Sequence, residues 1–152
     1  MPSRKPYKER TDLERIQSQW NKLGGLHTRE EWSATIVRAA TAAELAANFA
    51  IRKEFGSRSK FDVKFVDSLL RWANGLAGKI DHLLIPLTVG EKHQKIIKKL
   101  KAMSEEINGK RNAIVHQGEF CNAEEAKTSI QKSEEFIEAV MRVYEPNFAL
   151  KK

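Results

Sequence analysis

The stretch TREEWSATIVRAATAAELAANFAIRKEF occupies residues 28–55 and decides the fold. The apolar residues that keep helical spacing along it are Trp32, Ile36, Ala39, Ala43, Ala46 and Ala50. Steps of three and four residues place these side chains on one face of a helix. Alanine lets a second helix approach closely, and a helix of this length crosses a whole domain. We therefore expect a long helix from Thr28 to about Phe55, ended by Gly56.

The residues before this helix predict a shorter helix behind a loose terminus. Residues 1–10 are polar and basic and carry two prolines, which is typical of a flexible tail. Thr11 and Glu14 have the spacing of a capping box, so the first helix should begin at Thr11. Its apolar stripe consists of Leu13, Ile16, Trp20 and Leu23. The glycine pair 24–25 should end it, and residues 11–152 should form a single domain.

A third helical segment is expected after Ser59 or Asp62. Its stripe consists of Phe65, Leu69, Trp72, Leu76, Ile80 and Leu83 or Leu84. The Asn74-Gly75 pair and Gly78 weaken the helix and should bend or split it. Pro86 should close the segment, because the residue before a proline avoids the helical region.

Two further helices complete the expected fold. The fourth starts after Gly90 and stops at Gly118. Its stripe consists of Ile96, Leu100, Met103, Ile107 and Ile114. The fifth begins at Asn122, which has capping-box spacing with Glu125, and ends before Pro146. Its stripe consists of Ala126, Ile130, Ser133, Ile137, Val140 and Tyr144. With no alternating strand pattern, the sequence predicts an all-α, antiparallel up-down bundle of four to five helices with short connections.

Composition narrows the class of protein and of partner. The 27 basic and 20 acidic residues give a net charge of +7, which suits a polyanionic partner such as RNA, although many small domains are basic without a specific reason. The single cysteine, Cys121, excludes an internal disulfide and fits a reducing compartment. No apolar run approaches the roughly 20 residues that span a bilayer, so we expect a cytoplasmic protein without membrane contact.

The segment Arg111-Asn112-Ala113-Ile114-Val115-His116 is the most unusual part of the chain. Arg111 falls on the apolar stripe between Ile107 and Ile114, where an arginine is costly unless it is paired or faces a ligand. Arginine can hold a phosphate through two parallel hydrogen bonds and can stabilise a pentacoordinate transition state. His116, at the end of the helix, can accept the proton of an RNA 2′-hydroxyl or protonate the leaving oxygen. The pair is therefore suited to phosphodiester chemistry without a metal.

The segment from Arg111 to Gly118 resembles the motif of HEPN domains (higher eukaryotes and prokaryotes nucleotide-binding). That motif is an arginine, usually followed by a polar residue, and a histidine four to six residues further on. The resemblance covers the helical part of the chain, roughly residues 11–145, by length and helix order. Many HEPN proteins are metal-independent endoribonucleases of toxin–antitoxin, phage-defence or RNA-processing systems. The resemblance thus implies an RNA substrate, no metal and no cofactor, and it makes an antitoxin or a nucleotidyltransferase a candidate partner.

The same resemblance assigns roles to four residues. It implies that Arg111 and His116 are catalytic and that Asn112 is a polar orienting residue. HEPN proteins often carry an acidic residue on an earlier long helix, and Glu44, set among alanines, is similar to it. HEPN proteins usually dimerise so that two motifs meet in one composite site. Geometry adds to this, because residues 111 and 116 point about 140° apart on a straight helix. Either the helix unwinds before His116 or a second chain of a two-fold homodimer completes the site.

Structural explanations compete with each of these assignments. Arg111 could pair with a buried carboxylate, His116 could cap the helix, and Glu44 could be an ordinary surface carboxylate. The three other histidines have no metal-ligand spacing, and no third residue supports a Cys121 nucleophile. The tryptophans at 20, 32 and 72 are expected in the core, and the lysines at 92, 95, 98, 99 and 101 on a solvated face.

Three functions follow from these alternatives. The first is a metal-independent endoribonuclease that cleaves RNA by attack of the 2′-hydroxyl. The second is a non-catalytic HEPN-like module that binds RNA, a nucleotide or a protein. The third is a structural helical adaptor without affinity for nucleic acid. Only the first requires both Arg111 and His116 for its activity.

Overall fold

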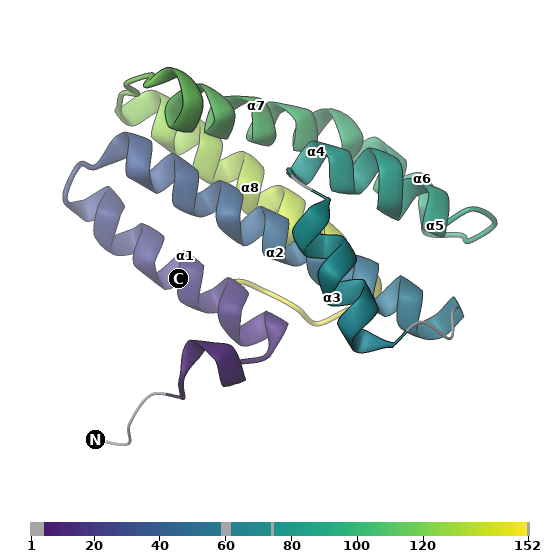
Figure 1. Ribbon diagram of the computed structural model, residues 1–152. Coiled ribbons are helices and arrows are strands. Elements are labelled where there is room, and N and C mark those ends of the chain that lie inside the picture. Colours follow the sequence, from purple (N-terminus) through teal and green to yellow (C-terminus); the bar gives the residue numbers. More distant parts are fainter. Residues whose placement is uncertain (1–4, 59–61, 74, 152) are drawn as a thin grey trace.

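The computed structural model describes residues 5–58, 62–73 and 75–151, and every regular element within these ranges is helical (Figure 1). The long helices are α1 (Asp12–Thr28), α2 (Trp32–Arg58), α7 (Lys101–Gln117) and α8 (Ala123–Tyr144). The shorter elements are the 3-10 helix η1 (Tyr7–Glu9), α3 (Val63–Trp72), α4 (Leu76–Gly78), the π-helix η2 (Lys79–Leu84), α5 (Ile85–Leu87) and α6 (Gln94–Lys99). An all-helical bundle was the fold class expected from the sequence. In none of these ranges is a helix both long and apolar enough to cross a membrane.

Helix α2 is the centre of the bundle. It makes its most extensive contacts with α1 and α8, and α7 also packs against it. Its buried small residues are Ala39, Ala40, Ala42, Ala43, Ala46, Ala47 and Ala50. Because alanine has a minimal side chain, neighbouring helices can approach α2 closely on more than one side. Figure 1 shows α1 and α2 running in opposite directions, as do α7 and α8.

The predicted helix starts at Thr11 and Asn122 are confirmed. In each case the capping side chain accepts a hydrogen bond from the backbone N–H three residues on, and the glutamate there bonds back. Gly118 ends α7 as predicted, with a left-handed backbone (φ 69°) that few other residues adopt without strain.

The predicted end of α1 is wrong, because the helix continues through Gly24 and Gly25 to Thr28. A glycine ends a helix when it adopts a left-handed conformation, and neither of these two has a positive φ. The hydroxyl of Thr28 instead donates to the carbonyl of Gly24 (2.9 Å), and the N–H of Arg29 donates to the carbonyl of Gly25 (3.2 Å). The residues around the pair thus keep it helical at a modest cost in backbone entropy.

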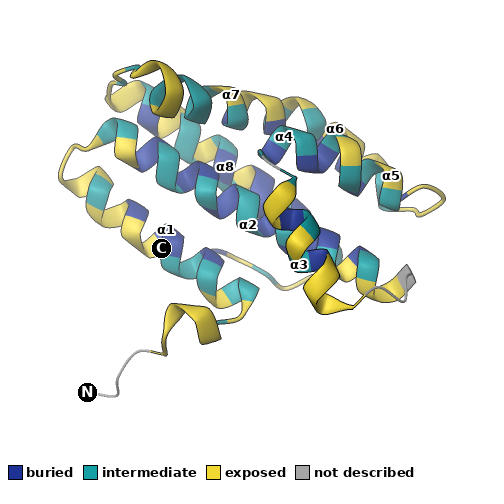
Figure 2. Ribbon diagram, in the orientation of Figure 1, coloured by how far each residue is buried: buried dark blue, intermediate teal, exposed yellow. Residues whose placement is uncertain are grey.

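The third predicted helix is split at Gly75, as the sequence indicated, but the residues that it buries are not those of the predicted apolar stripe. Val66 and Leu70 are buried in α3, whereas Phe65 and Trp72 are exposed. The prediction extended one stripe across the whole segment, but the break lets α3 rotate independently of the residues after Gly75 (φ 86°). Figure 2 shows the exposed residues along the outer face of α3. Trp72 is therefore not a core residue, and the alternative start at Ser59 lies outside the described residues.

Two other predicted boundaries are wrong. Pro86 lies inside α5, and Ile85 before it has helical angles (φ −61°, ψ −52°), so the helical stretch continues through the proline to Leu87. The fourth predicted helix is divided into α6 and α7 at Leu100, whose ψ of −8° departs from helical values. Leu100 itself stays buried, whereas Ile96 is exposed, so the short α6 does not share the stripe of α7.

Candidate active site

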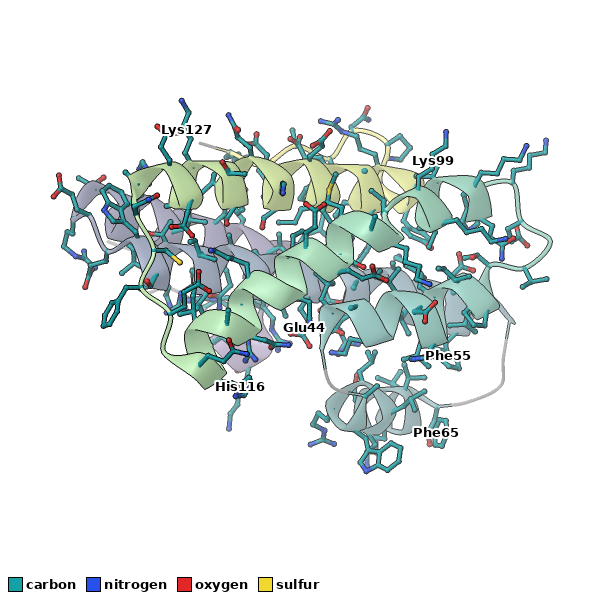
Figure 3. All side chains as sticks on the ribbon, turned by 90° about the horizontal axis from the view of Figure 1, so that it is seen from above. Glu44, Phe55, Phe65, Lys99, His116 and Lys127 are labelled. Atoms are coloured by element: carbon teal, nitrogen blue, oxygen red, sulfur yellow. The ribbon has the colours of Figure 1, made fainter. Side chains whose placement is uncertain are left out.

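Residues far apart in the sequence line one pocket of about 350 Å³ where α2, the start of α4 and α7 meet. The lining residues are Ala40, Thr41 and Glu44 of α2, Gly75 and Leu76, and Asn108, Arg111 and His116 of α7. Three of the four predicted site residues therefore meet in this pocket. In Figure 3, Glu44 lies beside the C-terminal turns of α7, and His116 lies at the end of that helix. Asn112, the fourth, does not line the pocket.

Arg111 and His116 lie together within a single chain. Nη1 of Arg111 lies 3.5 Å from Nε2 of His116, and α7 continues without unwinding to Gln117. The expectation that one chain aims the two groups poorly is wrong, because the long arginine side chain spans the angle between the two positions. Arginine only donates hydrogen bonds, so this contact is a hydrogen bond only when Nε2 of His116 carries no proton. At 3.5 Å this contact is weak, and a substrate oxygen can replace it at little cost.

The surroundings of Arg111 bear on the alternative that it is a structural ion-pair partner. Arg111 is half-buried, and Nη1 also donates to Oδ1 of Asn112 at 3.2 Å. Within the described ranges, no carboxylate lies within salt-bridge distance of its guanidinium group. The arginine therefore enters the pocket with its positive charge not neutralised by a described acidic group. Asn112 contacts the guanidinium rather than the pocket, as an orienting group would.

Glu44 is held by a lysine that the predicted site did not include. Nζ of Lys79 lies 2.8 Å from Oε1 of Glu44, and the side chain of Lys79 is only 4% exposed, compared with 35% for Glu44. A buried ammonium group is tolerated only with a close partner, so the pair fixes the position of Glu44 at the pocket wall. The sequence contained a signal for this residue, because Lys79 falls between Leu76 and Ile80 within an apolar stripe.

Asn108 closes the pocket from α7. The N–H of Leu76 donates to Oδ1 of Asn108 at 2.9 Å, which caps the start of the helical stretch that follows Gly75. A Cβ atom at Gly75 would lie 3.2 Å from the same oxygen, so the close approach of these two segments favours glycine. Asn108 stands one helical turn before Arg111, and this spacing could have identified it as a neighbour on the same face.

A separate acidic cluster lies on the α8 side of α7. Within the described residues, Glu119, Cys121 and Glu125 could offer ligand atoms to a metal, with those atoms within 4.8 Å of one another. The ammonium group of Lys110 already bonds both carboxylates, at 2.8 Å in the case of Glu119. Burial raises the pKa of the Cys121 thiol, which opposes formation of the thiolate that would bind a metal. The cluster is therefore an ion-pair network rather than a second candidate site.

Comparison with known proteins identified no relative of the chain. The chain matches no protein-family model, no curated protein and no solved structure.

Proposed function

We propose that the protein is a metal-independent endoribonuclease and that the pocket on α7 binds the scissile phosphate of RNA. The observation that carries the proposal is the 3.5 Å approach of Arg111 to His116 in a pocket shared with Glu44. A permanent cation without a described carboxylate partner attracts an anion, and an imidazole beside it can accept or donate a proton. The net charge of +7 favours the same class of ligand.

The proposed reaction needs one charge stabiliser and two proton transfers. The RNA 2′-oxygen attacks the adjacent phosphorus, the bond to the 5′-oxygen breaks, and the products end in a 2′,3′-cyclic phosphate and a 5′-hydroxyl. Arg111 stabilises the added charge on the phosphoryl oxygens in the transition state. His116 either accepts the proton of the 2′-hydroxyl through Nε2 or, when protonated, donates one to the leaving oxygen. Glu44 orients the bound ribose or water from the wall formed by α2.

We propose further that two copies of the chain form a composite site, as the HEPN resemblance implies. Val115 is 46% exposed immediately before His116, and Phe120 is 94% exposed in the loop after α7. Exposed apolar side chains on both sides of His116 are suited to burial against a second copy. The antiparallel pairs α1–α2 and α7–α8 support a HEPN-like arrangement of the bundle (Figure 1).

The decisive experiment measures cleavage of labelled single-stranded RNA by the purified protein in excess EDTA. We expect cleavage to yield cyclic phosphate ends and to fall about 10²- to 10⁴-fold in His116→Ala and about 10²- to 10³-fold in Arg111→Ala. His82→Ala is the matched control for the histidine and Arg29→Ala for the arginine, because both residues are exposed at a distance in the sequence from the motif. The controls should retain full activity.

Two results would contradict the proposal in different ways. Equal cleavage by wild type and both motif variants would assign the activity to a contaminating nuclease. Salt-dependent RNA binding that requires Arg111, without cleavage of any RNA tested, would favour the non-catalytic binding module. The proposed toxin or phage-defence role is tested with the same variants: expression of the wild type, but not of His116→Ala, should arrest bacterial growth.

A further inference from the structure

Trp72 is an exposed aromatic residue next to the candidate active site. It is the last residue of α3, and its side chain is 85% exposed. Gly75, which lines the pocket, follows three residues later, so the two Cα atoms are at most about 11 Å apart. Exposure of a whole indole ring is unfavourable in water, so its burial against a ligand would be favourable.

The outer face of α3 combines aromatic and basic side chains. Phe65 and Trp72 stand seven residues apart, which places them two turns or about 10.5 Å apart and within about 20° around the helix axis. Lys64 and Arg71 repeat this spacing one position earlier, so two exposed cations form a parallel row about 100° around the helix axis from the two rings. Figure 3 shows Phe65 and His116 on the same side of the bundle.

One of the two acidic residues near α3 is paired with an arginine of α2, and the other keeps its negative charge at the start of the helix. Asp67 bonds Nε of Arg52 at 3.0 Å, and Asp62 accepts the N–H of Phe65 at 2.8 Å as the cap of the helix. Interleaved aromatic and basic side chains characterise surfaces that bind single-stranded nucleic acid, where bases stack on the rings and cations follow the backbone. A base inside a duplex could not reach an aromatic ring in this way.

We infer that Trp72 stacks on an unpaired base of the RNA strand whose phosphate enters the Arg111–His116 pocket. Trp72 is then a substrate-binding residue that selects single-stranded or looped RNA, and this inference rests on the proposed function of the pocket. The binding surface is centred on Trp72, with Arg71 and Lys64 on the adjoining row of the helix.

The test measures RNA binding in the uncleaving His116→Ala background, with a single-stranded oligonucleotide and the corresponding duplex. Trp20 is buried and Trp32 half-buried, so Trp72 is the most exposed tryptophan. Stacking of a base on Trp72 should therefore quench the tryptophan fluorescence of the protein. We expect Trp72→Ala to weaken single-strand binding about 5- to 140-fold, which is the range for loss of one base–aromatic stack. Trp72→Phe should restore most of the affinity while removing the quenching. Val89→Ala, an exposed apolar control in the loop before α6, should change neither signal.

In the active protein, Trp72→Ala should raise KM with little change in kcat, because stacking on a base contributes equally to substrate and transition state. Unchanged affinity and KM in Trp72→Ala would overturn the inference and leave the ribonuclease proposal intact, and the exposed face would then belong to a protein partner. Conversely, quenching by RNA in a protein that cleaves nothing would support stacking while contradicting the proposed catalysis. Equal binding of duplex and single strand would also overturn the inference.

Discussion

Removal of Glu44 should destabilise the protein more than removal of Lys79, although the two residues form one ion pair. The two atoms lie 2.8 Å apart, but Lys79 is 4% exposed and Glu44 is 35% exposed. Glu44→Ala leaves an ammonium group in the core without its partner. Removal of one partner from a fully buried pair costs about 3–5 kcal/mol, and because water can enter the space left by Glu44 we expect about 2–3 kcal/mol.

The reverse change should be milder. Lys79→Met replaces the buried ammonium group with an apolar chain of similar length, and the remaining carboxylate can be hydrated. We expect a loss of about 0–1 kcal/mol, since apolar replacements of buried charges are often neutral. The double variant Glu44→Ala/Lys79→Met contains no unpaired buried charge. It should resemble Lys79→Met, which gives a coupling energy of about 2–3 kcal/mol between the two sites.

Urea unfolding followed by helical circular dichroism at pH 7 measures these differences, provided that the slope with urea stays constant among variants. For a domain of this size, Glu44→Ala should lower Tm by about 4–12 °C. The reasoning is refuted if Glu44→Ala costs no more than Lys79→Met, or if the two losses add in the double variant. RNA cleavage by the double variant then separates two roles of Glu44: full activity would make it only the partner of Lys79, and a loss would support its role in the pocket.

Two further predictions concern the surroundings of the site. Gly75→Ala should destabilise the protein by about 1–3 kcal/mol in the same unfolding assay, because an alanine must adopt a conformation (φ 86°, ψ 143°) nearly exclusive to glycine and its Cβ would lie 3.2 Å from Oδ1 of Asn108; the exposed helical Gly109→Ala should instead be neutral or stabilising. The hydrogen bond from Lys110 lowers the pKa of Glu125, so this carboxyl contributes stability that is present above its unfolded-state pKa near 4.5 and is lost as the pH falls through its lower folded-state value. Lys110→Met should therefore raise the pKa of Glu125, measured from its carboxyl resonance by NMR, and weaken the dependence of stability on pH below 5; an unchanged titration would contradict the assigned cause.

The sequence correctly predicted the helix ends that are set by hydrogen bonds between residues close together in the chain. The capping boxes at Thr11 and Asn122 and the stop at Gly118 involve groups only a few residues apart, so their hydrogen bonds can be read from spacing. The stripe of α3 could not be predicted in this way. Its buried face depends on how the chain turns at Gly75, and an error of one residue moves a stripe by about 100° around a helix. This error placed Trp72 in the core.

Identification of the candidate site required both local sequence patterns and the contacts between distant segments. The resemblance of the α7 motif and the position of Glu44 led to three residues that share a pocket, although α2 and α7 are far apart in the sequence. Lys79 and Asn108 were missed because each is recognised by its partner, namely Glu44 and the N–H of Leu76. Contacts between distant segments are set by tertiary packing, and periodicity along one helix does not specify them.

The geometry of Arg111 and His116 also changes what a second copy would contribute. The angular argument treated each side chain as a direction from the helix axis and therefore required a second chain to bring the two groups together. One chain already brings Nη1 and Nε2 within 3.5 Å. A single histidine, however, is in one protonation state at a time, and the proposed cleavage needs both an acceptor for the 2′-hydroxyl proton and a donor for the leaving oxygen. Under the proposed mechanism, a second copy therefore contributes the second proton transfer through its own His116. A dimer of one wild-type and one His116→Ala chain should retain the charge stabilisation but lose one of the two proton transfers.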